Sequence, residues 1–157
     1  MASYGYYQSP IGLIKITADE ASVLSLEFIE TKVNQETLNS NNLVINNCLE
    51  QLNQYFKQDL TTFDLPLAPK GTKFQELVWK ETLKIPYNQA ITYQELAQKI
   101  NHPKACRAVG SALGKNPLAI FIPCHRVISR NKKIINYSSG KERKIFLQTL
   151  ESLQQKK

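Results

Sequence analysis

A cysteine and a histidine, Cys124 and His125, stand side by side after the apolar run LAIFI, residues 118–122. This run is too short for a typical helix and predicts a buried strand, which Pro123 ends. A thiol at the end of such a strand can reach a pocket and act as a nucleophile; the alternative is an inert buried thiol. A nucleophilic Cys124 needs a base or nearby cations, because at an ordinary pKa of about 8.5 little of it is thiolate at neutral pH.

His125 and Glu151 are the candidates for activating this thiol. Successive side chains of a strand point to opposite faces, so a Cys124–His125 pair requires a turn or a bridging water molecule. Glu151, in the helical pattern ERKIFLQTLES of residues 142–152, can orient the imidazole from a distance in sequence. Together the three residues permit a cysteine–histidine–carboxylate relay.

The other two cysteines are not predicted to be reactive. Cys48 lies on a helical apolar stripe and is predicted to be core, and Cys106 is predicted to be a surface or helix-contact thiol. Three cysteines without a CxxC pair argue against a disulfide framework and against a zinc site.

The composition indicates a globular protein, with 42% apolar and 21% charged residues among 157. No stretch of 18 apolar residues is present, so we expect no membrane span. The N-terminus MASYGYYQSP lacks the basic start and apolar core of a secretory signal, so we expect a cytoplasmic protein.

Charge divides the chain at a boundary that Pro66 and Pro69 also suggest, near Lys70. Residues 1–70 hold four Lys and eight acidic residues, a balance of −4, whereas residues 71–157 hold a balance of +11. We predict two domains with these bounds. The basic half favours binding to a polyanion such as nucleic acid, and the alternative is an ordinary basic surface.

The two halves also differ in pattern. Residues 6–28 alternate in the manner of antiparallel strands, and a helix around Cys48 follows. In the second half, residues 71–86 place Phe74, Val78, Trp79 and Leu83 on one helical stripe. The segment ITYQELAQKI then starts with Thr92 and Glu95 at the spacing of a capping box.

A further helix is predicted through KACRAVGSALGK, residues 104–115, after a tight turn, and this pair is typical of a helix-turn-helix. Its core face comprises Ala105, Ala108, Val109, Ala112 and Leu113, which leaves an outer face of Lys104, Arg107, Gly110, Ser111 and Lys115. Glycine in a helix costs roughly 1 kcal/mol relative to alanine, so Gly110 serves either tight helix packing or the close approach of a partner.

Five ordered blocks carry a family resemblance: GTKFQELVW, ITYQELA, ACRAVGSALGKNP, IPCHRV and NYSSG. From about Gly71 to Glu151 the chain resembles the C-terminal domain of O6-alkylguanine-DNA alkyltransferases, and SPIGLIKITADE is similar more loosely to their N-terminal domain. The resemblance implies an α/β (α+β) chain. A small ribonuclease-H-like α/β domain would precede a helical, winged-helix-like DNA-binding domain with a helix-turn-helix.

The resemblance also implies roles for single residues. Cys124 matches the alkyl acceptor, His125 the water-linked base, Glu151 the carboxylate that holds it, and Asn116 the hinge asparagine. Tyr93, Ser138 and the backbone of Val127 match groups that bind the purine, and Tyr137 lies in the loop that forms a pocket wall. Arg107 matches the arginine that enters the base stack, within a DNA-contacting set of Lys104, Ala105, Arg107, Gly110, Ser111 and Lys115.

The implied activity is repair of O6-alkylguanine, and of O4-alkylthymine, in double-stranded DNA. The base is flipped out of the duplex, and its alkyl group passes irreversibly to Cys124, so one molecule repairs one lesion. The resemblance implies a monomer that needs no cofactor and no metal.

Two rival functions stay open at this point. A non-catalytic alkyltransferase-like protein would bind the lesion without an acceptor cysteine, which the presence of Cys124 opposes. A cysteine hydrolase would use the same relay, but it would need an oxyanion hole and would give the basic helix-turn-helix no purpose. Ile135 and Ser139 stand where the family commonly has glycine, so we expect a stiffer, narrower pocket that favours methyl over benzyl adducts.

Overall fold

The computed structural model describes residues 2–30, 41–130, 137 and 139–155. The chain divides into two compact units, Met1–Pro69 and Lys70–Lys157. Among the described residues, no helix has the length and apolar character that a bilayer crossing requires.

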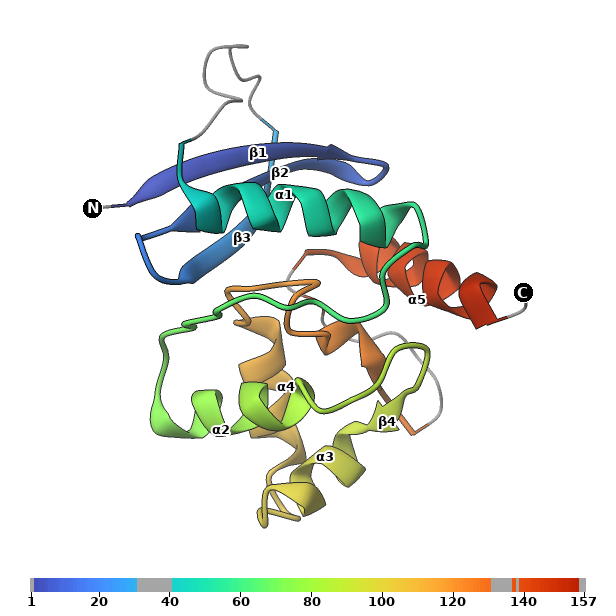
Figure 1. The fold of residues 1–157 in the computed structure, drawn as a ribbon. Coiled ribbons are helices and arrows are strands. Elements are labelled where there is room, and N and C mark those ends of the chain that lie inside the picture. The colour runs from blue at the N-terminus through green and yellow to red at the C-terminus, as the bar shows by residue number, and fades with distance from the viewer. Residues whose placement is uncertain (1, 31–40, 131–136, 138, 156–157) are drawn as a thin grey trace. The chain divides into compact units, whose positions relative to one another are not determined.

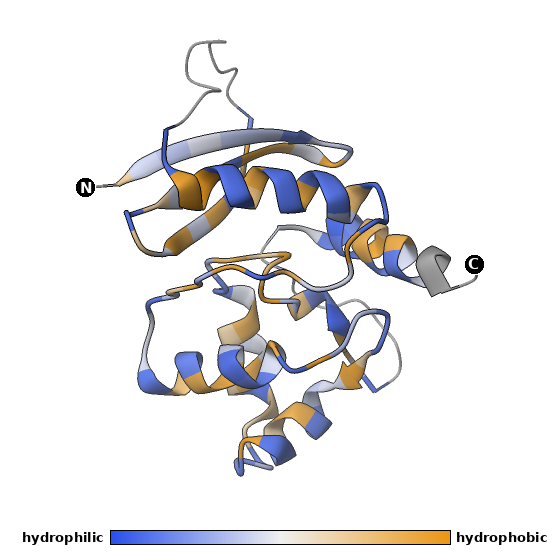
Figure 2. Ribbon diagram, in the orientation of Figure 1, coloured by the Kyte–Doolittle hydropathy of each residue, from blue (hydrophilic) through white to orange (hydrophobic). Residues whose placement is uncertain are grey.

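The first unit is a three-stranded antiparallel sheet with one helix, as the alternating pattern predicts (Figure 1). Its strands are β1 (Ser3–Ser9), β2 (Gly12–Ala18) and β3 (Val23–Ile29), in the order β1-β2-β3. Helix α1 (Leu43–Phe56) buries Ile45, Cys48, Leu52 and Tyr55. Gly5 of β1 allows this packing, because a Cβ atom there would overlap Ile45 of α1. Figure 2 shows the resulting alternation of hydrophobic and hydrophilic residues along α1.

The second unit is mainly helical. It contains α2 (Lys73–Thr82), β4 (Ile91–Thr92), α3 (Tyr93–Lys99), α4 (Cys106–Gly114), the 3₁₀ turn η2 (Cys124–Arg126), β5 (Val127–Ile128) and α5 (Lys141–Gln155). Strands β4 and β5 pair in parallel, with Ile91 opposite Val127. The indole N–H of Trp79 donates to the Ala112 carbonyl at 2.8 Å and ties α2 to α4.

The predicted helix-turn-helix is confirmed as α3 and α4, joined at Ile100–Ala105. Helix α3 begins with the predicted capping box, in which the Thr92 hydroxyl accepts from the Glu95 N–H and the Glu95 carboxylate accepts from the Thr92 N–H. Helix α2 begins with a second capping box, formed by Thr72 and Gln75.

Two residues predicted to be core are exposed. Leu83 follows Thr82, the last residue of α2, and is 43% exposed. Because the helix ends at Thr82, the apolar face of the helix does not extend to Leu83. Ile85 is buried two residues later. Ala108 is exposed because it lies at the edge of the inner face of α4, which buries Val109, Ala112 and Leu113.

The strand predicted for residues 118–122 is wrong. These residues form a buried turn, which the Ile122 N–H closes by donating to the Leu118 carbonyl at 2.8 Å. Ile120 adopts a φ of 75° in it, although the left-handed region disfavours a β-branched residue. Hydrophobicity predicted the burial correctly, but a short apolar run does not distinguish a strand from a turn that buries the same side chains.

Candidate active site

Cys124 lies in η2 rather than at the end of a strand, and its side chain is almost fully buried, with 3% of the residue exposed. Its main partner is Asn116, whose Nδ2 donates to the Cys124 sulfur at 3.2 Å. Burial raises the pKa of the thiol to about 11, while Asn116, Lys144 and Tyr137 each act to lower it. The buried thiol therefore depends on its polar neighbours to ionise.

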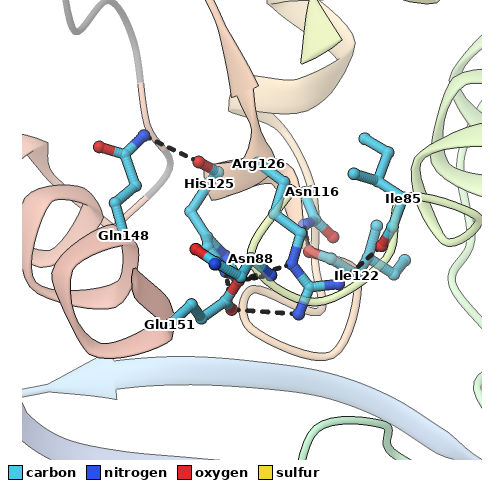
Figure 3. A network of polar contacts seen from close by, with 8 residues as sticks. All are labelled: Ile85, Asn88, Asn116, Ile122, His125, Arg126, Gln148 and Glu151. Atoms are coloured by element: carbon cyan, nitrogen blue, oxygen red, sulfur yellow. Dashed lines mark hydrogen bonds and ion pairs between the residues drawn. The ribbon is translucent and has the colours of Figure 1, made fainter. Parts of the chain in front are cut away.

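Asn116 also shapes the turn that presents Cys124. Its Oδ1 accepts from the Leu118 N–H at 2.9 Å. Its Nδ2 donates to the Ile122 carbonyl at 3.0 Å, as Figure 3 shows. One side chain thus bonds both ends of the 118–122 turn and the thiol that follows it. These bonds help to hold Ile120 in a conformation that costs about 1–3 kcal/mol.

His125 is completely buried and pairs with Glu151 of α5, as the relay predicted. Its Nε2 lies 2.6 Å from Glu151 Oε2, and its backbone carbonyl accepts from Gln148 Nε2 at 2.9 Å (Figure 3). Burial lowers the pKa of His125, so its neutral form is favoured. Since a carboxylate can only accept, Nε2 carries the proton and Nδ1 keeps a free lone pair. Within the described part of the chain, Nδ1 has no hydrogen-bond partner, which leaves it available as a base.

Glu151 stays ionised because it forms a two-point ion pair with Arg126. Arg126 donates from Nε to Oε1 at 2.9 Å and from Nη2 to Oε2 at 3.1 Å, and the Asn88 N–H donates to Oε1 at 3.2 Å. The bonds from His125 and Arg126 hold the pKa of Glu151 well below its usual range, although burial alone would raise it. The remaining Arg126 nitrogen, Nη1, donates to the Ile85 carbonyl at 2.7 Å. The network is therefore larger than the predicted relay by one buried arginine.

No direct hydrogen bond joins Cys124 to His125 among the described residues. The 3₁₀ turn at Cys124–Arg126 supplies the bend that a Cys124–His125 pair was predicted to require. The bridging water molecule stays a prediction.

A group of side chains borders the thiol from three further segments. Tyr93 begins α3, Tyr137 precedes α5, and Lys144 lies on α5 with only 1% of its surface exposed. Lys144 Nζ donates to the Val127 carbonyl at 2.9 Å and approaches the Tyr93 hydroxyl at 3.5 Å. Burial and the nearby thiolate raise the pKa of Tyr93, and burial raises the pKa of Tyr137 still further. Both phenols therefore remain protonated donors at neutral pH.

Ser138 and Ile135 lie outside the described residues. Ser139 is half-buried, and its carbonyl accepts from Arg143 Nη1 at 3.0 Å. The proposed effect of residues 135 and 139 on pocket width stays a prediction.

The outer face of α4, together with the residues just before and after the helix, is basic and exposed. Lys104, Arg107, Ser111 and Lys115 are exposed, whereas Ala105 and Gly110 are partly buried. A Cβ atom added to Gly110 would meet only the Tyr93 ring, at 4.0 Å, so tight helix packing does not explain this glycine. The close approach of a partner is the alternative that remains.

Arg126 and Lys144 were not predicted as site residues, although the sequence around each contains an indication of burial. Arg126 follows His125 within a run that is otherwise apolar on both sides, where a charge needs a partner. Lys144 precedes Glu151 by seven residues, which is two helical turns, so both lie on the same face of α5.

Comparison with known proteins assigns both units. Residues 2–69 match the ribonuclease-like domain of 6-O-methylguanine DNA methyltransferase, and residues 73–153 match its DNA-binding domain. The methylated-DNA–protein-cysteine methyltransferase of Methanosarcina acetivorans is 43% identical, over 94% of this chain and 97% of its own. The protein of that name from Haemophilus influenzae is 37% identical, over 96% and 86%.

Solved structures agree. The crystal structure of the Mycobacterium tuberculosis O6-methylguanine methyltransferase has a TM-score of 0.87 and 38% identity, and the match covers 98% of this chain and 94% of that one. A structure of the same mycobacterial protein in complex with DNA also has a TM-score of 0.87, with 97% and 94% covered. Fold and sequence thus agree, and the chain belongs to the 6-O-methylguanine DNA methyltransferase family.

Proposed function

We propose that this protein repairs O6-alkylguanine, and O4-alkylthymine, in double-stranded DNA by transferring the alkyl group to its own Cys124. The observation that carries the proposal is Cys124 itself, which lies in IPCHRV beside Asn116 and next to the His125–Glu151–Arg126 network. The family membership and the relatives' names support it. The reaction needs no cofactor, since the lesion supplies the alkyl group and the protein supplies the acceptor.

Geometry supports an assignment of steps. His125 Nδ1 takes the thiol proton through a water molecule, and Glu151 stabilises the imidazolium that results. The sulfur lone pair forms a bond to the alkyl carbon while the carbon–O6 bond breaks and leaves its electron pair on the guanine. Tyr93 donates a hydrogen bond to the developing anion. Overall, the thiol exchanges its proton for the alkyl group and the guanine exchanges the alkyl group for a proton.

The product explains why each molecule acts once. A thioether at Cys124 has no easy hydrolytic exit, unlike the thioester of a cysteine hydrolase, so the thiol is not regenerated. In this proposal Asn116 holds the thiol in place. The Val127 carbonyl and Ser138 bind the purine, and Tyr137 lines the alkyl pocket.

DNA enters through the helix-turn-helix. A methyl group on O6 lies inside the duplex, so the nucleotide must be flipped, at a cost of a few kcal/mol. Arg107 on the exposed face of α4 fills the vacated stack, Gly110 allows the close approach, and Lys104, Ala105, Ser111 and Lys115 contact the DNA. We assign this work to residues 71–157, with residues 1–70 as a bracing domain, and we propose that the protein acts as a monomer.

Stoichiometric methyl transfer tests the proposal. The protein is incubated with a duplex that carries one isotope-labelled O6-methylguanine, and intact-protein and peptide mass analysis follow. We expect one methyl group per molecule, on Cys124, and no uptake by Cys124→Ala, which should still bind the duplex. Binding without methyl uptake by the unchanged protein would favour a non-catalytic lesion-binding protein. Label on Cys106, or more than one turnover, would contradict the proposal.

Arg107→Ala separates flipping from chemistry. The variant should lose methyl transfer from duplex DNA by about tenfold or more, because the extruded base leaves an unfilled gap, while its reaction with free O6-benzylguanine should change little. Equal losses with both substrates would contradict the role of Arg107.

A further inference from the structure

The segment of residues 85–89, between α2 and β4, contacts both members of the buried ion pair of the relay. The Ile85 carbonyl accepts from Arg126 Nη1 at 2.7 Å. Three residues later, the Asn88 N–H donates to Glu151 Oε1 at 3.2 Å (Figure 3). The backbone of one short segment therefore supplies an acceptor for the cation and a donor for the carboxylate.

A β-turn shapes this segment. The Gln89 N–H donates to the Pro86 carbonyl at 3.2 Å and closes the turn. Asn88 occupies the third position of the turn with a φ of 59°, in the left-handed region. Type II turns require a positive φ at this position and favour glycine or asparagine there. Because the turn is closed by the Gln89 N–H, the Asn88 N–H can donate outside the turn, and it reaches Glu151.

Tyr87, at the second position of the turn, adds a contact with the cation. Its ring centroid lies 5.6 Å from Arg126 Cζ, within the distance at which a guanidinium is attracted to an aromatic ring. Burial and the Glu151 carboxylate raise the pKa of Tyr87 to about 12, while Arg126 acts to lower it. The phenol therefore stays neutral at moderate pH, and Tyr87 contributes an aromatic ring and no charge.

The position of Glu151 decides which nitrogen of His125 can act as the base. Glu151 Oε2 lies 2.6 Å from His125 Nε2, which keeps the proton on Nε2 and the lone pair on Nδ1. A carboxylate that rotated or withdrew would allow the imidazole to exchange tautomers. The base would then be present in only a fraction of the molecules, so the carboxylate needs fixed supports.

We propose that Tyr87 and Asn88 are positioning residues: their turn holds the Arg126–Glu151 pair where it fixes the tautomer of the histidine base. The inference rests on the proposed function and names a segment on which its relay depends. Asn88 acts through its backbone N–H, and its side chain matters because asparagine accepts the left-handed conformation more readily than most residues. Tyr87 acts through its ring.

Five variants separate the conformation of the turn from its side chains. Asn88→Val disfavours the left-handed conformation, because a β-branched residue is strained there, whereas Asn88→Gly adopts it freely. Tyr87→Leu removes the ring, and Tyr87→Phe keeps it. Asn101→Val is the matched control for backbone strain, since Asn101 is exposed and has a φ of 61° in the turn between α3 and α4.

The tautomer is measured without DNA, by nitrogen magnetic resonance of the full-length protein with labelled histidines. The chain has two histidines, and the structure gives them opposite tautomers. His102 Nδ1 lies 2.7 Å from the Ile100 carbonyl, so Nδ1 carries the proton there, whereas His125 carries its proton on Nε2. The signals of the two rings can therefore be told apart.

Asn88→Val and Tyr87→Leu should each show a mixture of tautomers at His125 and an unchanged His102. Asn88→Gly, Tyr87→Phe and Asn101→Val should keep the proton of His125 on Nε2. Strain alone would affect Asn101→Val as well, so the comparison separates positioning from a general loss of stability.

Methyl transfer from duplex DNA gives the second measurement. At saturating duplex and pH 7.5, Asn88→Val and Tyr87→Leu should transfer the methyl group about tenfold or more slowly than the unchanged protein, because less of the base is present in the active form. Their affinity for the duplex should stay the same. Asn88→Gly and Tyr87→Phe should recover most of the rate. Asn101→Val is left out of this measurement, because its turn joins the two helices of the helix-turn-helix.

Two results would overturn the proposal. One is an unchanged His125 tautomer in Asn88→Val and Tyr87→Leu, and the other is an equal loss of transfer in Asn88→Val and Asn88→Gly. If Asn88→Val does not fold, the comparison of Tyr87→Leu with Tyr87→Phe decides. If the unchanged protein takes no methyl group from DNA, the proposed function fails, but the tautomer measurement still decides whether the turn positions His125.

Discussion

At the scale of single residues, the site is a set of buried polar and charged side chains that depend on one another for hydrogen bonds and ion pairs. Arg126 keeps Glu151 ionised, Glu151 sets the protonated nitrogen of His125, and Asn116 holds the thiol. Each of these groups would be costly to bury alone, so removal of one partner penalises the others.

Arg126→Met tests this dependence. The change leaves the Glu151 carboxylate buried without its cation and leaves the Ile85 carbonyl without its donor, so we expect a loss of about 3–5 kcal/mol in the free energy of unfolding. Urea denaturation followed by circular dichroism measures it. Lys84→Met, which removes the exposed Lys84–Glu81 pair, is the control and should change stability by less than about 0.5 kcal/mol. Similar small effects of both changes would show that the Arg126–Glu151 pair does not hold the site.

The buried imidazole gives the stability a dependence on pH. Burial lowers the pKa of His125 in the folded protein, so below its unfolded value of about 6.5 the unfolded chain binds a proton that the folded chain does not. Stability should therefore fall by about 1 kcal/mol between pH 7.5 and pH 5.5. A further loss should appear below about pH 4.3, where the unfolded chain protonates Glu151 and the folded chain does not. Urea midpoints that stay constant from pH 7.5 to pH 5.5 would contradict the depressed pKa of His125.

At the scale of elements, much could be predicted from patterns that depend on neighbours in sequence. The capping box at Thr92, the α1 stripe around Cys48 and the turn between α3 and α4 are of this kind. The turn at residues 118–122 could not be predicted, because the Asn116 side chain that shapes it acts through tertiary bonds. The Arg126–Glu151 pair joins residues 25 apart, so spacing alone carries little signal for it.

Helix α4 offers a test that separates folding from binding. Gly110→Ala should raise stability by about 1 kcal/mol, because alanine favours a helix and the structure leaves room for its methyl group. The same methyl group should weaken DNA binding and slow alkyl transfer if DNA approaches this face closely.

Gly114→Ala is the matched control on the same helix, where an added Cβ atom meets nothing within 4 Å. It should affect affinity little. The affinities are measured by gel-shift titration with duplex DNA. Equal affinities of Gly110→Ala and Gly114→Ala would show that Gly110 is not at the interface.

At the scale of the whole molecule, charge is divided between −4 in residues 1–70 and +11 in residues 71–157. Binding to DNA should therefore weaken steeply as salt increases, through release of counterions from the phosphates. Lys115→Gln should reduce the slope of log affinity against log salt by about 1. Lys57→Gln, an exposed change in the acidic half, should leave the slope unchanged. An affinity that does not respond to salt would exclude the basic half as the DNA-binding surface.

Trp79 allows the unfolding of the two units to be followed separately by spectroscopy. It is the single tryptophan of the chain, it is 2% exposed, and its indole N–H is bound to Ala112 of α4. Its emission thus reports on the interior of Lys70–Lys157 alone, whereas circular dichroism in the far ultraviolet reports on helices and strands of both units. A melting curve recorded in both ways, without any label, would show whether the half of the chain that carries the reactive cysteine loses its structure together with the other half or by itself.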